Sequence, residues 1–145
     1  MKTILKDYEP IYTDGSRKDD KAAAAAVKGE HIYTERLPDR SSIFSAELHA
    51  VFLAMDHIET SRKRKFVIFS DSMSCLQAIS GKDWKNPLVQ KVLERLHNLQ
   101  KELSKSVIFC WIPSHVGIKG NEAADTAAKA GLDLSDKYAN TICRF

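Results

Sequence analysis

The sequence predicts an α/β protein in which one mixed, five-stranded β-sheet is flanked by α-helices. Two observations indicate this class. Three strand-like segments occupy the first 36 residues, and two short apolar segments, 66–69 and 107–112, then alternate with helical patterns. The order β-β-β-α-β-α-α-β-α implies a mixed sheet with helices on its faces. With 145 residues, 43% of them hydrophobic, we expect one domain over residues 1–145.

The first three elements are predicted to be strands. Residues 11–13 are rich in β-formers and lead into Asp14, Gly15 and Ser16, which we interpret as a strand ending in a hairpin turn. Residues 22–26 are all alanine and have high helix propensity, but the segment is too short to hold a helix alone, so we interpret it as a strand. His31–Arg36 alternates as a third strand would.

A helical pattern follows the three strands. Apolar residues recur at helical spacing from Leu48 to Ile58, and the helix is expected to end near Ser61. Ser45 is a suitable N-cap residue, which would place Glu47 in the first turn.

The second half of the chain alternates strands and helices. The apolar segment 66–69 has the composition of a central parallel strand that is buried on both faces. Ser72 is predicted to cap a short helix that stops at Gly81. An amphipathic helix is expected from Pro87 to Leu103, then a strand over 107–112, and then a helix that Asn121 caps and that ends at residue 131.

Composition limits the class of protein. The 22 basic and 19 acidic residues, with a net charge of +3, permit nucleic-acid binding but do not indicate it. Cys75, Cys110 and Cys143 form no CxxC pair, so neither a disulfide framework nor a zinc site is expected. No apolar run approaches a signal peptide core or the ~20 residues of a membrane span. We therefore expect an intracellular protein, or a domain of one, without membrane contact.

Four separated carboxylates are candidates for one site. Asp14 and Asp71 each end a predicted strand, while Glu47 and Asp125 lie near predicted helix starts. Such ends converge at the carboxyl edge of a sheet, where ligands of α/β proteins bind. Clustered carboxylates repel unless a cation lies between them, and Mg²⁺ prefers oxygen ligands. Two such ions about 4 Å apart can activate water and stabilise the leaving oxygen of a phosphodiester.

The motifs around these carboxylates resemble those of the type 1 ribonuclease H family. YTDGS, AELHA, SDSM and SHVGIKGNEAAD occur in the family's order over residues 12–125. The resemblance implies a ribonuclease H-like fold and an endonuclease that cuts the RNA strand of RNA/DNA hybrids, leaving 3′-hydroxyl and 5′-phosphate ends. It implies two Mg²⁺ ions, with Mn²⁺ as an alternative, held by the four carboxylates. Asp14 would contact both ions, Glu47 and Asp71 the ion near the leaving group, and Asp125 the ion near the water.

Other residues take roles from the same resemblance. His115, in a loop with Gly117 and Gly120, would assist proton transfer or product release, since imidazole changes protonation near neutral pH. The residues expected to contact the hybrid are Gly15, Ser16, Ser45, Trp84 and Asn121. Trp84 could equally pack its loop onto the body. The basic cluster 62–65 is either a solvated loop or a phosphate contact.

Two departures from the family pattern bear on the chain's origin. Ser42, Ile43, Phe44 and Ser45 stand where the family often has groove-reading asparagines, and no Lys/Trp-rich basic handle follows the second helix. The chain in this respect looks most similar to ribonuclease H domains of retroelement polyproteins, particularly non-LTR retrotransposons. The resemblance implies a reverse transcriptase domain as a partner.

Two alternative functions differ in their carboxylates. A catalytically silent hybrid-binding or structural module of a polymerase polyprotein would be expected to have lost one of the four. Exonucleases of the same fold typically carry DxE on the first strand, and integrases a glutamate on the late helix, where this chain has Asp14 followed by Gly15 and Ser16, and Asp125. The intact acidic set favours the active nuclease.

Overall fold

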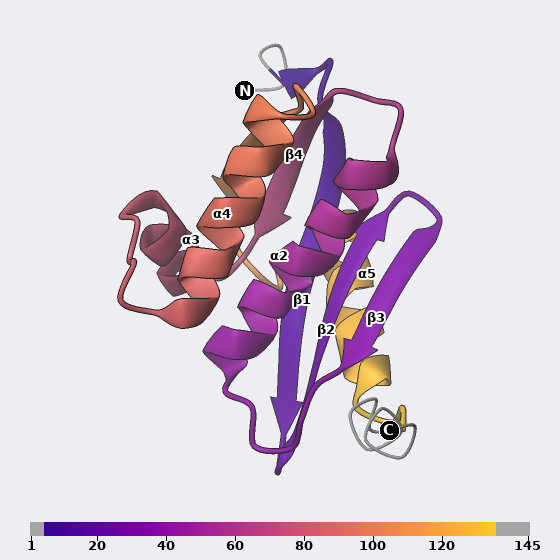
Figure 1. Ribbon diagram of the computed structural model, residues 1–145. Helices are drawn as coiled ribbons and strands as arrows, with labels where there is room; N and C mark the ends of the chain where they lie inside the picture. The colour runs from indigo at the N-terminus through magenta and orange to yellow at the C-terminus, as the bar shows by residue number, and fades with distance from the viewer. Residues whose placement is uncertain (1–4, 136–145) are drawn as a thin grey trace.

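The computed structural model describes residues 5–135 and contains the predicted five-stranded mixed sheet with helices on both faces (Figure 1). The strands are β1 (Glu9–Lys18), β2 (Lys21–Lys28), β3 (His31–Arg36), β4 (Lys65–Ser70) and β5 (Ser106–Trp111). The described helices are α2 (Ile43–Thr60), α3 (Met73–Ser80), α4 (Pro87–Lys101) and α5 (Lys119–Gly131). The predicted order of elements is confirmed.

The sheet has the order β3-β2-β1-β4-β5, with β1 at its centre. The pairs β1–β2 and β2–β3 are antiparallel, whereas β1–β4 and β4–β5 are parallel. Thr13 pairs with Ser70, the last residue of β4, so Asp14 lies beside the carboxyl end of that strand. The prediction of a central parallel strand at 66–69 is confirmed.

The predicted hairpin turn at Asp14 and Gly15 is wrong. Strand β1 continues to Lys18, which pairs with Lys21, and Asp19 takes the positive φ of 56° that the turn requires. An Asp-Gly dipeptide favours a turn locally, but pairing with the whole of β2 outweighs that preference. The β1–β2 hairpin therefore projects four residues beyond Asp14.

The alanine segment is the strand β2, as predicted, and it is buried on both faces. Ala22 and Ala24 pack with Ala46 and Ala50 of α2, while Ala25 packs with α5 on the opposite face. Helices α2 and α5 thus cover opposite faces of the same strands (Figure 1). Alanine side chains allow both helices to approach the sheet closely.

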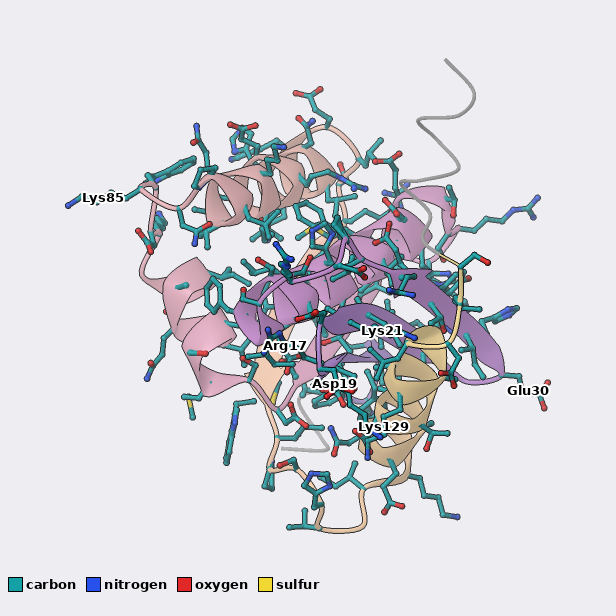
Figure 2. All side chains as sticks on the ribbon, turned by 90° about the horizontal axis from the view of Figure 1, so that it is seen from below. Arg17, Asp19, Lys21, Glu30, Lys85 and Lys129 are labelled. Carbon is teal, nitrogen blue, oxygen red and sulfur yellow. The ribbon has the colours of Figure 1, made fainter. Side chains whose placement is uncertain are left out.

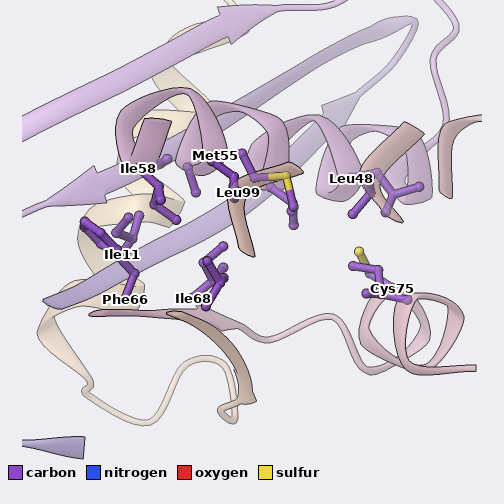
Figure 3. Close-up of a cluster of buried hydrophobic side chains, with 14 of the residues drawn as sticks. Ile11, Leu48, Met55, Ile58, Phe66, Ile68, Cys75 and Leu99 are labelled. Carbon is purple, nitrogen blue, oxygen red and sulfur yellow. The ribbon is translucent and has the colours of Figure 1, made fainter. Parts of the chain in front are cut away.

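The main hydrophobic core lies between the sheet and the helices α2, α3 and α4 (Figure 3). Its largest fully buried members come from the two central strands and from helices on one face: Ile11, Phe66, Ile68, Leu48, Met55, Ile58 and Leu99. Burying one such side chain contributes about 1.5–3 kcal/mol. This core fixes the strands whose ends carry the carboxylates.

Helix ends differ from the predictions at two places. Ser42, not Ser45, is the N-cap of α2, and its side chain accepts a hydrogen bond from the Ser45 amide. Glu47 consequently lies in the second turn rather than the first. Ser72 caps α3 as predicted. Helix α4 ends at Lys101, so Leu103 lies beyond it and is exposed.

Arg36 joins the end of β3 to the end of α5. The side chain is 7% exposed, and its Nη1 donates to the carbonyl oxygens of Leu134 at 2.8 Å and Leu132 at 3.4 Å. Helix carbonyls at a C-terminus lack partners within the helix, and a guanidinium is suited to bind them. Arg36 therefore stabilises the C-terminal end of the helix that carries Asp125.

Two further features concern the chain's chemistry and surroundings. Cys75 and Cys110 are free thiols, and Cys143 lies outside the described residues. None of the helices within residues 5–135 is both long and apolar enough to cross a membrane.

Candidate metal centre

Three carboxylates meet beside the carboxyl end of β4. Asp14 comes from β1, Asp71 from the residue after β4, and Glu47 from α2. One oxygen of each lies within 4.8 Å of those of the other two. Asp14 is 5% exposed and Glu47 is 8% exposed, so two of the three are nearly removed from water. We call these three residues the carboxylate cluster.

Asp125 lies next to this cluster rather than within it. It is in the middle of α5, not near the helix start as predicted, and its charge acts on Asp14. Its Oδ2 lies 3.0 Å from Lys129 Nζ, one turn later in the same helix. The structure therefore pairs the fourth carboxylate with a lysine.

Two glycines set the distances between β1 and the helices that carry the acidic residues. A Cβ at Gly15 would lie 2.7 Å from the backbone nitrogen of Glu47. A Cβ at Gly120 would lie 2.2 Å from the ring of Tyr12. A side chain at Gly15 would require α2 to move, and one at Gly120 would require either α5 or the Tyr12 ring to move. Gly120 is part of α5 rather than of the His115 loop, in which it was expected.

The surroundings of the carboxylate cluster strongly disfavour the ionised forms of its side chains. Burial, followed by repulsion from Asp71 and Asp125, raises the pKa of Asp14 to about 7. Burial and repulsion from Asp14 and Asp71 raise the pKa of Glu47 to about 9. Burial and the neighbouring Glu47 raise the pKa of the Cys75 thiol to about 12. Removing carboxylates from water and placing them together costs free energy unless a cation compensates for it.

Glu47 also has an unused ligand atom. Its Oε1 is buried and has no hydrogen-bond partner among residues 5–135. Buried polar atoms of folded proteins are nearly always satisfied, so an orphaned carboxylate oxygen indicates a missing partner. An all-oxygen donor set of this kind suits Mg²⁺ or a similar hard cation. Asp14, Glu47 and Asp71 therefore fit a divalent metal ion.

Asn121 has a different place from the one predicted. It is inside the first turn of α5, whose N-cap is Ile118 without a side-chain hydrogen bond, so the capping prediction is wrong. Asn121 is 3% exposed, and its Nδ2 donates to Asp71 Oδ2 at 3.1 Å. Packing of α5 against the sheet places the Asn121 side-chain amide beside the carboxylate cluster. It orients one oxygen of Asp71.

Trp111 is a residue of the site that sequence reasoning missed. Its Nε1 donates to the backbone carbonyl of Asp71 at 3.3 Å, although 44% of the residue is exposed. A tryptophan at the end of a strand, with an N–H that needs an acceptor, is the signal that could have indicated this contact. Asp71 is thus held through its main chain by β5 and through its side chain by α5.

His115 lies on the exposed loop 112–118 between β5 and α5. Its φ is 57°, and Gly117 has a φ of 87°. No hydrogen bond or ion pair joins the His115 side chain to another residue within 5–135. The structure therefore does not bring His115 into the carboxylate cluster, although the loop starts beside Trp111.

The remaining predicted contact residues have diverse positions. Ser16 is half-buried on β1, two residues after Asp14, and Ser45 is half-buried in the first turn of α2. Trp84 is 52% exposed in the loop between α3 and α4. Its neighbour Lys85 projects from the opposite side of the molecule from Lys129 (Figure 2).

A mixed sheet with an acidic cluster beside the carboxyl end of a central parallel strand is an arrangement in which the sheet positions ligands for a divalent metal ion. The chain belongs to the RNase H family, whose profile matches residues 6–133.

Individual relatives are similar over most of the chain. Human ribonuclease H1 is 28% identical over 152 residues, which cover 92% of this chain and 53% of that protein. The Pol polyprotein of equine infectious anemia virus (strain Wyoming) is 30% identical over 137 residues, covering 90% of this chain and 11% of that protein. The chain thus spans about half of the human relative and about a tenth of the viral one.

A solved structure has the same fold. The crystal structure of LC11-RNase H1 in complex with an RNA/DNA hybrid superposes with a TM-score of 0.68. The match covers 86% of this chain and 96% of that chain at 18% sequence identity. At this identity the likeness establishes the architecture of the five strands and their helices.

Proposed function

We propose that this domain is a metal-dependent endonuclease that hydrolyses the RNA strand of RNA/DNA hybrids, giving 3′-hydroxyl and 5′-phosphate ends. The observation that carries the proposal is the carboxylate cluster with its orphaned Glu47 Oε1. Membership of the RNase H family and the hybrid bound to LC11-RNase H1 support the choice of substrate.

The proposed metal ligands are the cluster and Asp125. Two Mg²⁺ ions, for which Mn²⁺ can substitute, would supply Lewis-acid activation of water and stabilisation of the leaving oxygen. Asp14 is affected electrostatically by both Asp71 and Asp125, which supports it as the ligand shared between two sites. Glu47 is affected by Asp14 and Asp71, which supports the site nearer the leaving group. Asn121 and Trp111 hold Asp71 in place.

His115 is proposed to move protons rather than to hold a metal. The side chain is exposed, and it lies on a loop between the strand end at Trp111 and the helix of Asp125. Imidazole can accept or donate a proton near neutral pH, and help of this kind is typically worth 10²–10⁴-fold. Replacement of His115 by alanine is therefore expected to slow cleavage without abolishing it.

Contacts to the hybrid are proposed for the exposed surface around the cluster. Ser16 follows Gly15 on β1, and Ser45 lies on α2, the helix that packs against Gly15; their hydroxyl groups suit 2′-hydroxyl or phosphate oxygens. Gly15 allows the close approach of β1 and α2, and its backbone would contact the hybrid at this position. Trp84 offers an exposed ring, more distant, for stacking on a sugar or base.

We also propose that the domain serves reverse transcription in a retroelement, of non-LTR type, with a reverse transcriptase domain in the same polyprotein. The similarity to a segment of a viral Pol polyprotein supports this setting. The short connection between α3 and α4, residues 81–86, supports it too, because it leaves no room for a basic handle. As part of the same proposal, residues 1–145 form a single domain.

Cleavage assays test the activity. Wild-type protein with Mg²⁺ is given an RNA/DNA hybrid, duplex RNA and duplex DNA in parallel, and only the hybrid is expected to be cut, in its RNA strand. Asp71→Asn keeps the shape of the side chain but removes a ligand charge, so it should abolish cleavage. Asp83→Asn, in the exposed loop after α3, is the matched control and should cut like wild type. Cleavage by Asp71→Asn within tenfold of wild type would refute the metal assignment.

A further inference from the structure

A cavity of about 560 Å³ lies between the β1–β2 hairpin and the C-terminal end of α5. Its walls come from the hairpin residues Ser16, Arg17, Lys18, Asp19 and Lys21 and from Lys129, Leu132 and Asp133. We call it the hairpin pocket. Figure 2 views the molecule from the side toward which β1 and β4 point, and Arg17, Lys21 and Lys129 lie near one another there. The volume is in the range of sites that bind a nucleotide-sized ligand.

The pocket is basic although the chain as a whole is only slightly so. Four of its lining residues are cationic and two are acidic, which leaves a local charge of +2. Lys18 and Lys21 face each other directly in the antiparallel register. Like charges in this position are destabilising. Neither lysine forms an ion pair within residues 5–135, so an external anion is the partner that would offset the repulsion.

The pocket adjoins the carboxylate cluster. Lys129 forms both a wall of the pocket and the ion pair with Asp125. Ser16, another wall residue, follows Asp14 by two positions on β1. At about 3.3 Å per strand residue, Lys18 lies roughly 13 Å along β1 from Asp14. One strand of a duplex advances about 3.4 Å per nucleotide along its axis, so this distance corresponds to about four nucleotides.

The wall formed by α5 is held firmly against the sheet. A Cβ at Gly131 would lie 2.8 Å from the Cβ of Ala23 and 2.6 Å from Thr34 Cγ2, so the helix end contacts β2 and β3 at the closest distance a backbone permits. Arg36 binds the carbonyl oxygens of Leu132 and Leu134 immediately after this contact. The backbones of the two walls therefore keep a defined separation.

We propose that the hairpin pocket binds a phosphodiester group of the nucleic-acid strand that enters the carboxylate cluster, three to four nucleotides from the bond that is cut. This inference rests on the proposed function for the identity of the strand. The pocket gives a chain of net charge +3 a local anchor that its overall charge does not provide. It also places positive charge beside a cluster that would otherwise repel a phosphate backbone.

Binding across a salt series tests the pocket. The double variant Lys18→Ala/Lys21→Ala is compared with Lys91→Ala/Lys101→Ala, which removes the same charge from exposed positions of α4. Hybrid affinity is measured in Ca²⁺. Each lost phosphate contact lowers the slope of log K against log salt by about 0.9, so the hairpin variant should lose about one to two units of slope and bind roughly tenfold more weakly. The α4 variant should keep the wild-type slope. Equal effects of the two double variants would overturn the proposal.

A second measurement gives a result even if the hybrid is the wrong substrate. Amide resonances of the wild-type chain are followed by NMR during titration with a single-stranded RNA trinucleotide and, separately, with inorganic phosphate. A phosphodiester site is supported if the amide resonances of residues 16–21 and 129–133 shift at a lower concentration of trinucleotide than of phosphate. Equal response to both would mean a free-phosphate site, and no response at these amides would mean no site; both overturn the proposal. Failed cleavage with intact trinucleotide binding would refute the proposed function alone.

The hairpin variant should fold normally, because removal of a like-charge pair favours the hairpin. Thermal unfolding checks this, with Lys18→Gln/Lys21→Gln as a second variant that keeps longer polar side chains. A loss of hybrid affinity in the alanine variant that the glutamine variant does not share would show lost packing rather than lost charge, and would also overturn the proposal.

Discussion

Metal affinity is expected to depend steeply on pH, because the carboxylate cluster must lose protons when a cation binds. The pKa of Asp14 is about 7 and that of Glu47 about 9 without metal. At pH 6 both are mostly protonated, and at pH 8 only Glu47 is. Metal ligands must be deprotonated, so binding releases about two protons at the lower pH and about one at the higher.

The size of the effect follows from these two values. Treating the two groups as separate sites, the fraction of cluster with both carboxylates ionised rises roughly 10³-fold between pH 6 and pH 8, equivalent to about 4 kcal/mol of binding free energy. Glu47→Gln leaves only Asp14 to titrate, and the rise should shrink to about tenfold. Glu94→Gln, on the exposed side of α4, should keep the wild-type dependence.

Calorimetric titration with Mg²⁺ alone at pH 6, 7 and 8 checks this prediction. Comparison of buffers with different ionisation enthalpies gives the number of protons released directly. An affinity that changes less than tenfold over this range in the wild type would show that the cluster is already ionised without metal, and would refute the argument from burial and repulsion.

Three further predictions concern stability and packing. The raised pKa values make the folded state bind more protons than the unfolded chain. In the presence of a chelator, the free energy of unfolding should therefore fall as pH rises from about 4 to about 9, and Mg²⁺ should reverse this loss. Chemical denaturation at a series of pH values, with chelator or with Mg²⁺, measures both effects. Gly120→Ala places a Cβ 2.2 Å from the Tyr12 ring and should lower the free energy of unfolding by about 1–3 kcal/mol, despite the better helix propensity of alanine. Thr126→Ala, on the exposed surface of α5, should change this free energy little. Urea unfolding of the two variants measures the difference. Arg36→Met removes two hydrogen bonds to carbonyl oxygens at the end of α5 and the ion pair with Asp39, and should lower stability by about 2–4 kcal/mol. Faster hydrogen exchange should be concentrated in residues 127–132, and a uniform change across the protein would contradict the capping role.

Strand and helix order could be predicted from the sequence because the apolar pattern is strong. The alanine segment 22–26 is the clearest case: its helix propensity is high, but its length excluded an isolated helix, and the structure has β2 there. Local signals were less reliable at the ends of elements. Ser42 and Ser45 are both good N-cap residues three positions apart, and the sequence alone does not decide between them.

The convergence of three of the candidate carboxylates was predictable from the sequence, but their environment was not. Asp14, Glu47 and Asp71 follow from the motifs and from their places at element ends. The contact of Asn121 with Asp71 joins residues 50 positions apart, and the side chain lies inside a helix where a capping role had been expected. The unsatisfied Glu47 oxygen and the raised pKa values arise from burial, which depends on how closely α2 approaches β1 at Gly15. Such contacts are properties of the assembled fold.

The alanine strand has a consequence for how activity could change without any change in the ligands. Strand β2 acts as a spacer of minimal thickness between α2 and α5, the helices that carry Glu47 and Asp125. Bulkier residues at Ala24 or Ala25 would widen the gap between the helices and thus the separation of the carboxylates at its edge. Variation along β2 is therefore a route by which a lineage could tune the distance between the proposed metal ions, and with it the choice of ion, while every acidic residue stays the same.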